Sequence, residues 1–112
     1  MRRLHCIFLM ALLLPAWSRA VNPELPAEAE ALWDQAIAVE QDLRSWDALQ
    51  LFLQVEKLAP NNAKVLQKIA QQYSDSTVDY EDKDRQLELL DKALEYSERA
   101  VEIDPSDPVN VL

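Results

Sequence analysis

The side chains best suited to catalysis or metal binding lie together at the start of the chain. His5 and Cys6 are the only histidine and the only cysteine among the 112 residues. An imidazole can act as a general base, and a thiolate can act as a nucleophile or a zinc ligand. The apolar residues that follow them, however, have the character of a targeting segment rather than of an active site.

Residues 1–20 have the order of a secretory signal peptide. A basic pair precedes an apolar run over residues 4–14, and Ser18 and Ala20 place small side chains at −3 and −1 of a cleavage site. This run is about half the length of roughly 20 residues that a membrane-spanning helix needs. We therefore expect export, to the periplasm or outside the cell, with cleavage near Ala20. An uncleaved signal anchor and a buried N-terminal helix are the alternatives.

Cleavage would leave a chain with few chemical options. It would contain no histidine or cysteine, and the whole sequence has no glycine. Disulfides, Cys or His zinc sites, His-based triads and Gly-rich phosphate loops would then be excluded. Arg2, Arg3 and Arg19 would also be removed, so that 8 basic residues face 20 acidic ones, a net charge of −12. Such a surface repels nucleic acid and anionic membranes, and its charges form either a solvated surface or an acidic binding face.

The acidic residues between positions 75 and 84 raise the question of a calcium site. Counted from Asp75, an EF-hand loop needs glycine at its sixth place and glutamate at its twelfth, where this chain has Tyr80 and Gln86. We therefore expect no metal and no cofactor. Carboxylates, lysines and tyrosines remain as acid–base groups, but no pattern fixes two of them at a working distance, so we do not expect an enzyme.

The elements that must position these side chains are predicted to be helices. Apolar residues recur with a period near 3.6, and no stretch alternates with period 2. Prolines and the expected N-cap residues Ser45 and Asn62 mark the helix limits. The helices are expected over about 26–42, 45–60, 61–74 and 85–104, with a charged loop or a frayed helical extension over 75–84. On the last helix, the residues expected to face inward are Leu87, Leu90, Ala93, Leu94, Ser97, Ala100, Val101 and Ile103.

Two segments of the chain are similar to each other. EKLAPNN (56–62) aligns with VEIDPSD (101–107), and the small or aromatic residues before each proline have matching offsets. This pattern resembles the tetratricopeptide repeat, a 34-residue helix–turn–helix family. The repeat-packing residues that this resemblance assigns are Ala36, Ala48, Phe52, Pro60, Ala70, Tyr73, Ala93, Ala100 and Pro105.

The resemblance implies an all-α fold, an α-solenoid of antiparallel helix pairs with about four helices and the first turn of a fifth. The expected segments are a signal peptide at 1–20, a lead-in at 21–28, one unit at 29–62, a second at 63–107 with an acidic insertion at about 74–84, and the start of a truncated third unit at 108–112. The second unit is eleven residues longer than the norm, and its long connection resembles the regulators of microtubule dynamics. A generic helical bundle is the alternative.

Stacked repeats of this kind form a concave groove that is lined mainly by their first helices. By resemblance, the groove candidates are Glu30, Trp33, Ile37, Glu40, Lys64, Gln67, Lys68 and Gln71. Trp33 is either an exposed contact for a partner or a core residue. Lys64 and Lys68 lie one helical turn apart and either hold a ligand carboxylate or form a solvated face.

We therefore expect an exported module that binds a peptide or a partner helix in a concave groove. The alternatives are a structural capping or oligomerising element, whose uncovered C-terminal face joins another copy, and the N-terminal fragment of a larger repeat protein. The expected partner is a protein or peptide. We expect no nucleic acid, and no stable membrane insertion once the signal is removed.

Overall fold

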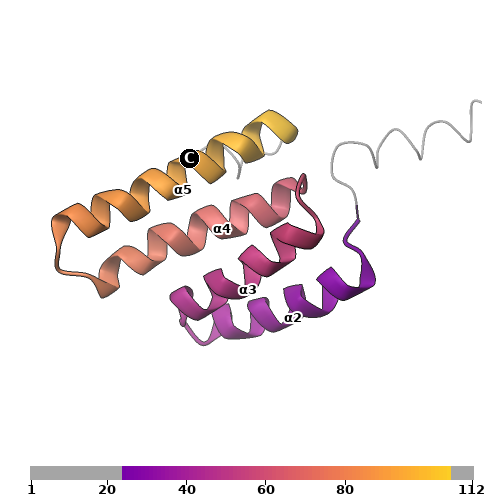
Figure 1. Ribbon diagram of the computed structural model, residues 1–112, viewed down its shortest axis with the longest axis horizontal. Helices are drawn as coiled ribbons and strands as arrows, with labels where there is room; N and C mark the ends of the chain where they lie inside the picture. The colour runs from indigo at the N-terminus through magenta and orange to yellow at the C-terminus, as the bar shows by residue number, and fades with distance from the viewer. Residues whose placement is uncertain (1–23, 107–112) are drawn as a thin grey trace, which may run out of the picture.

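The computed structural model describes residues 24–106, and that part of the chain contains helices and no strand (Figure 1). The helices lie side by side in chain order, each antiparallel to the one before it. They are α2 (Ala27–Gln41), α3 (Ser45–Leu58), α4 (Ala63–Asp75), the 3-10 helix η1 (Ser76–Asp79) and α5 (Lys83–Ile103). The expected all-α helical-repeat fold is confirmed. The expected signal peptide, His5 with Cys6, and the third unit at 108–112 lie outside the described residues.

Small side chains allow α2 and α3 to pack closely. Ala36 on α2 and Ala48 on α3 have no exposed surface, so the two backbones can approach each other. Phe52 and Val55, also fully buried, fill the space beyond them, and Ile69 joins the same core from α4. Burying a side chain of this size stabilises a fold by roughly 1.5–3 kcal/mol, so this core holds the first helix pair against α4.

The link from α3 to α4 is fixed by local chemistry. α3 ends at Leu58, two residues before Pro60, because the residue before a proline avoids the helical region. The Asn62 side chain then accepts hydrogen bonds from the backbone N–H groups of Lys64 at 3.0 Å and Val65 at 3.2 Å. These bonds satisfy two of the free donors at the start of α4, so the predicted N-cap Asn62 is confirmed. The prediction was wrong for Ser45, which is the first helical residue of α3, and the N-cap position there holds Arg44 without a side-chain cap hydrogen bond.

The link from α2 to α3 has an unusual backbone conformation. Leu43 has a φ of 61°, in the left-handed region, and its side chain is 89% exposed. This region usually holds glycine after a helix, and the chain has no glycine to place there. A non-glycine residue in this conformation costs about 1 kcal/mol, so the turn stores a small strain.

The acidic segment over 75–84, expected as a loop or a frayed helical extension, begins as a helical extension of α4. α4 extends to Asp75, and η1 follows at once. The guanidinium of Arg85 lies 5.3 Å from the Tyr80 ring centre and 5.8 Å from that of Trp46 on α3. Cation–π contacts of this kind connect the segment to the first helix pair.

The inward face of α5 is only partly as expected. Ala93, Ser97 and Ala100 are buried, as is Leu89. The prediction was wrong for three leucines that lie on another side of the helix, with exposed fractions of 59% for Leu87, 45% for Leu90 and 57% for Leu94. We call these three residues the α5 stripe. α5 is apolar on two sides, so its periodicity could not distinguish the packed side from the open one.

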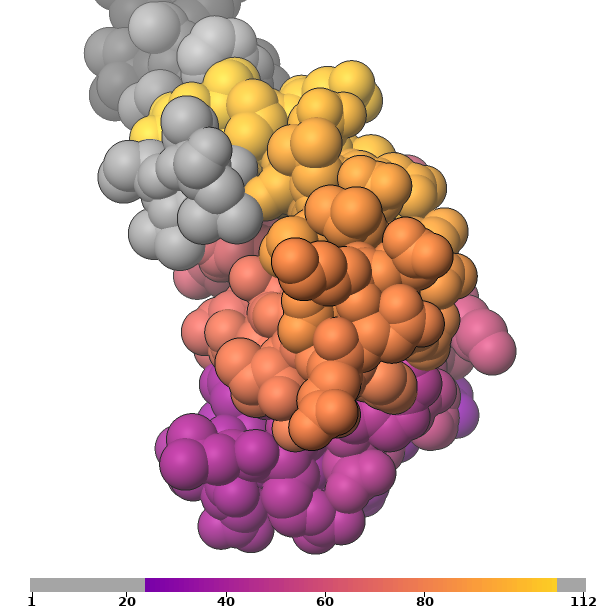
Figure 2. All heavy atoms as spheres, turned by 90° about the vertical axis from the view of Figure 1, so that its left-hand side faces the viewer, coloured from indigo at the N-terminus to yellow at the C-terminus, as the bar shows by residue number. Residues whose placement is uncertain are grey.

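The α4–α5 pair stacks on the α2–α3 pair, as the view from one end shows (Figure 2). Glu56 on α3 accepts hydrogen bonds from Arg99 at 3.0 Å and from the Tyr96 hydroxyl at 3.3 Å on α5. Tyr96 in turn stacks on Tyr73 with ring centres 5.8 Å apart. Burial, followed by the neighbouring Glu56 charge, raises the pKa of Tyr96. The ion pair between Glu56 and Arg99 therefore connects α3, the second helix of one pair, to α5, the second helix of the next.

Candidate interaction site on α2 and α4

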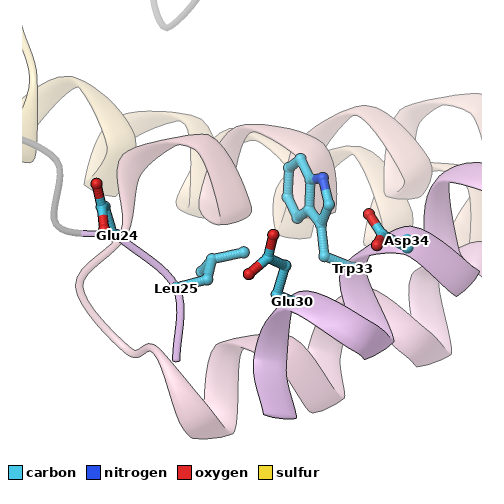
Figure 3. A pocket seen from close by; sticks show the side chains of 5 residues that line it. All are labelled: Glu24, Leu25, Glu30, Trp33 and Asp34. Carbon is cyan, nitrogen blue, oxygen red and sulfur yellow. The ribbon is translucent and has the colours of Figure 1, made fainter. Parts of the chain in front are cut away.

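A hollow of about 480 Å³ lies beside the first half of α2. It is lined by one aromatic, one aliphatic and three acidic side chains: Trp33, Leu25, Glu24, Glu30 and Asp34. Figure 3 shows the indole standing between the carboxylates of Glu30 and Asp34. The volume lies within the range of about 300–1,000 Å³ that is usual for ligand sites.

Packing against Phe52 holds the Trp33 ring in place. The indole is half-buried and makes an edge contact with Phe52, with ring centres 5.3 Å apart and planes at 68°. Phe52 itself is fully buried. Such edge-to-face pairs are favoured by the quadrupoles of the rings. Part of the indole therefore belongs to the core, and part of it lines the hollow.

A polar cluster joins the end of α2 to the middle of α4. The ammonium group of Lys68 lies 2.8 Å from the Glu40 carboxylate, and the two side chains are only 26% and 20% exposed. Gln72, which has no exposed surface, also donates to Glu40 through its amide. This second ion pair connects the first helix of one pair to the first helix of the next.

Some polar atoms near this cluster have no hydrogen-bond partner among the described residues. They are the Gln67 Nε2, the Gln72 Oε1 and the Ser76 Oγ, each shielded from solvent. Burial, with repulsion from Glu40 and partial compensation by Lys68, raises the pKa of Asp75. Unused hydrogen-bonding capacity therefore remains on α4 and at the start of η1.

The predicted groove residues come from two helices. α2 carries four and α4 the other four. Trp33, Ile37, Glu40, Gln67 and Lys68 are half-buried, while Glu30, Lys64 and Gln71 are exposed. Lys68 is engaged by Glu40, so Lys64 and Lys68 do not form a free pair of cations for a ligand carboxylate.

Sequence reasoning missed part of this site. Glu24 and Leu25 lie before the first helix, where no periodicity assigns them to a surface. Asp34 follows Glu30 by one helical turn, and this spacing was the available signal. Gln72 was missed because its buried contact with Glu40 crosses between helix pairs.

The α5 stripe is the other surface with an unusual composition. Leu94 has the same offset from Pro105 as Leu49 has from Pro60. Leu49 has no exposed surface, whereas Leu94 is 57% exposed. The side of α5 that corresponds to a covered side of α3 is therefore open in the described residues.

Two features of residues 24–106 bear on metal binding and on membrane insertion. No group of three or more His, Cys, Asp or Glu side chains there is placed to hold a metal ion. None of the helices in the same part of the chain is long and apolar enough to cross a membrane.

Comparison with known protein families finds a match over most of the chain. The sequence model of the family described as "Regulator of microtubule dynamics protein 1-3" matches residues 26–110. No curated protein and no solved structure matches the chain.

Proposed function

Because this chain belongs to the family of regulator of microtubule dynamics proteins 1-3, a helical domain of protein-interaction type, we propose that it recognises a peptide or partner helix. The binding surface is the side of α2 and α4 that carries the hollow and the polar cluster. The two helix pairs act as tetratricopeptide-like units, with α2 and α4 as their first helices. Recognition on such a preformed surface needs little change of shape.

The half-buried indole of Trp33 is the observation that carries this proposal. It lines a hollow of about 480 Å³ and rests on the buried Phe52 ring. Tryptophan is enriched at the residues that dominate binding, because a fixed aromatic ring offers a large contact area at little entropic cost. A residue that served packing alone would not need to line a hollow.

Site-specific photo-crosslinking tests this assignment. The full chain would carry p-benzoylphenylalanine in place of Gln71, which is exposed on α4, or in place of Leu90 on the α5 stripe. Glu28, exposed on α2 outside the hollow, is the matched control position. We expect a distinct adduct with a second protein from Gln71 in extract of the source cells, and loss of that adduct when Trp33→Ala is added. Adducts from Leu90 and none from Gln71 would contradict groove binding.

The α5 stripe favours a second candidate function, self-association as a structural element. Three exposed leucines on one helix are typical of an interface. Sedimentation of the full chain over a range of concentrations measures it. Growth of the mass with concentration, abolished by Leu90→Glu, would support this function, whereas a constant monomer mass would reject it.

Two broader expectations remain proposals. We propose export after cleavage near Ala20, which N-terminal sequencing of the secreted or periplasmic protein would test. We also propose that the protein acts by binding rather than catalysis, without a cofactor and without nucleic acid as a partner. The excess of acidic residues supports the last point, because it repels a polyanion.

A further inference from the structure

We propose that the hollow at Trp33 receives a basic side chain, arginine or lysine, from the bound segment. This inference rests on the proposed groove function and names the partner chemistry at one position of it. The cation would lie against the indole and between the carboxylates of Glu30 and Asp34.

The charge around the hollow has one sign. Glu24, Glu30 and Asp34 line it, and no basic residue does. None of these three carboxylates forms an ion pair within residues 24–106. Residues 27–41, the whole of α2, contain no lysine and no arginine. The hollow therefore attracts a cation and disfavours an acidic peptide.

The indole indicates which kind of cation fits. Arginine and lysine are attracted to the face of a tryptophan ring, and a guanidinium can also bind a carboxylate in its own plane. A metal ion would instead need several oxygen atoms at close range. Within the described residues, no cluster of three or more acidic side chains is placed to hold a metal ion. The three carboxylates are therefore spread around the hollow and do not converge on a single ion.

The Trp33 ring is held in place before a ligand arrives. Glu30 and Asp34 are one turn apart on the same helix, and Trp33 lies between them (Figure 3). The edge contact with the buried Phe52 holds the ring at 5.3 Å. A preorganised arrangement reduces the entropy that binding must overcome. The hollow of about 480 Å³ is also large enough for one long side chain and its backbone.

Nuclear magnetic resonance titration of the full chain tests the proposal with two matched probes. One is the peptide acetyl-Ala-Gly-Arg-Gly-Ala-amide, and the other has neutral citrulline in place of arginine. We expect the arginine peptide to shift the Trp33 indole N–H signal and the citrulline peptide to leave it unmoved. Glu30→Gln with Asp34→Asn should weaken binding about tenfold, because two charge-assisted contacts are lost. Glu28→Gln with Asp42→Asn removes the same charge outside the hollow and should change the affinity little.

The outcomes separate this inference from the function beneath it. Equal weakening by both double variants would mean that only overall charge matters and would overturn the inference. Equal binding of the two peptides at Trp33 would also overturn it but would leave the groove function intact. If neither peptide shifts Trp33, the basic-residue inference fails, and an additional lack of crosslinks from Gln71 would remove the groove function as well.

Discussion

Leu49 and Leu94 provide a matched pair of substitutions, because they occupy equivalent places in the two helix pairs. Leu49 has no exposed surface, and its replacement by alanine leaves a cavity in the core cluster that also contains Val55, Val65 and Ile69. Such a change costs about 3–5 kcal/mol in free energy of unfolding. Leu94 is 57% exposed, so water fills the vacated space, and we expect Leu94→Ala to cost about 1 kcal/mol or less.

Urea unfolding and thermal unfolding of the full chain, both followed by circular dichroism, measure the loss of stability in each variant. In a domain of this size about 1 kcal/mol corresponds to a shift of roughly 4–8 °C in Tm, so the two variants are easily separated. The result that would refute our reasoning is a loss for Leu94→Ala as large as that for Leu49→Ala, since the α5 stripe would then be covered in solution. If Leu49→Ala does not fold, Leu94→Ala measured against the unsubstituted chain still decides the question.

Other consequences of the structure can be tested in the same way. Lys68→Ala leaves the Glu40 carboxylate partly buried without its cation, so we expect a loss of about 2 kcal/mol in urea unfolding. Arg44→Ala removes an ion pair of more than half-exposed groups and should cost less than about 1 kcal/mol; equal losses would contradict this ranking. The raised pKa of Asp75 means that the folded state disfavours the charged form of this carboxyl group. The stability of the fold is therefore highest at low pH, where Asp75 is protonated, and it falls as the pH rises through the folded pKa. Asp75→Asn should therefore raise Tm at pH 7 and not at about pH 3, and a Tm gain that is the same at both pH values would disprove the assignment. Leu43→Asn should stabilise the chain by about 0.5–1 kcal/mol, because asparagine tolerates the left-handed conformation; a loss of stability would show that the turn is not strained.

Sequence reasoning predicted the helices because their signals are local. Proline at position 60 and the capping side chain of Asn62 act within a few residues of the helix end that they define. The same reasoning failed on the α5 stripe. Leu89 is buried and Leu90 is exposed, although both are leucines on a helix with apolar residues on two sides. Which side is covered depends on what else packs there, and periodicity does not contain that information.

The candidate site was predictable only in part for a related reason. A repeat pattern assigned Trp33 to the groove, but it could not show that one side of the ring packs on Phe52. The pairing of Lys68 with Glu40 joins residues 28 positions apart, so it depends on the register between helix pairs. No local spacing encodes that register. The expectation of two free lysines on α4 therefore could not be revised from the sequence.

The two ion pairs between the helix pairs have a mechanical consequence. Glu40 and Lys68 bridge the first helices, while Glu56 and Arg99 bridge the second helices, so the bonds lie on opposite flanks of one joint. Rocking toward either flank would stretch the bond on the other, so the joint resists bending in both directions. The two ion pairs therefore limit bending between the two described helix pairs. High salt should loosen the more exposed Arg99 side first and let the body bend one way before the other.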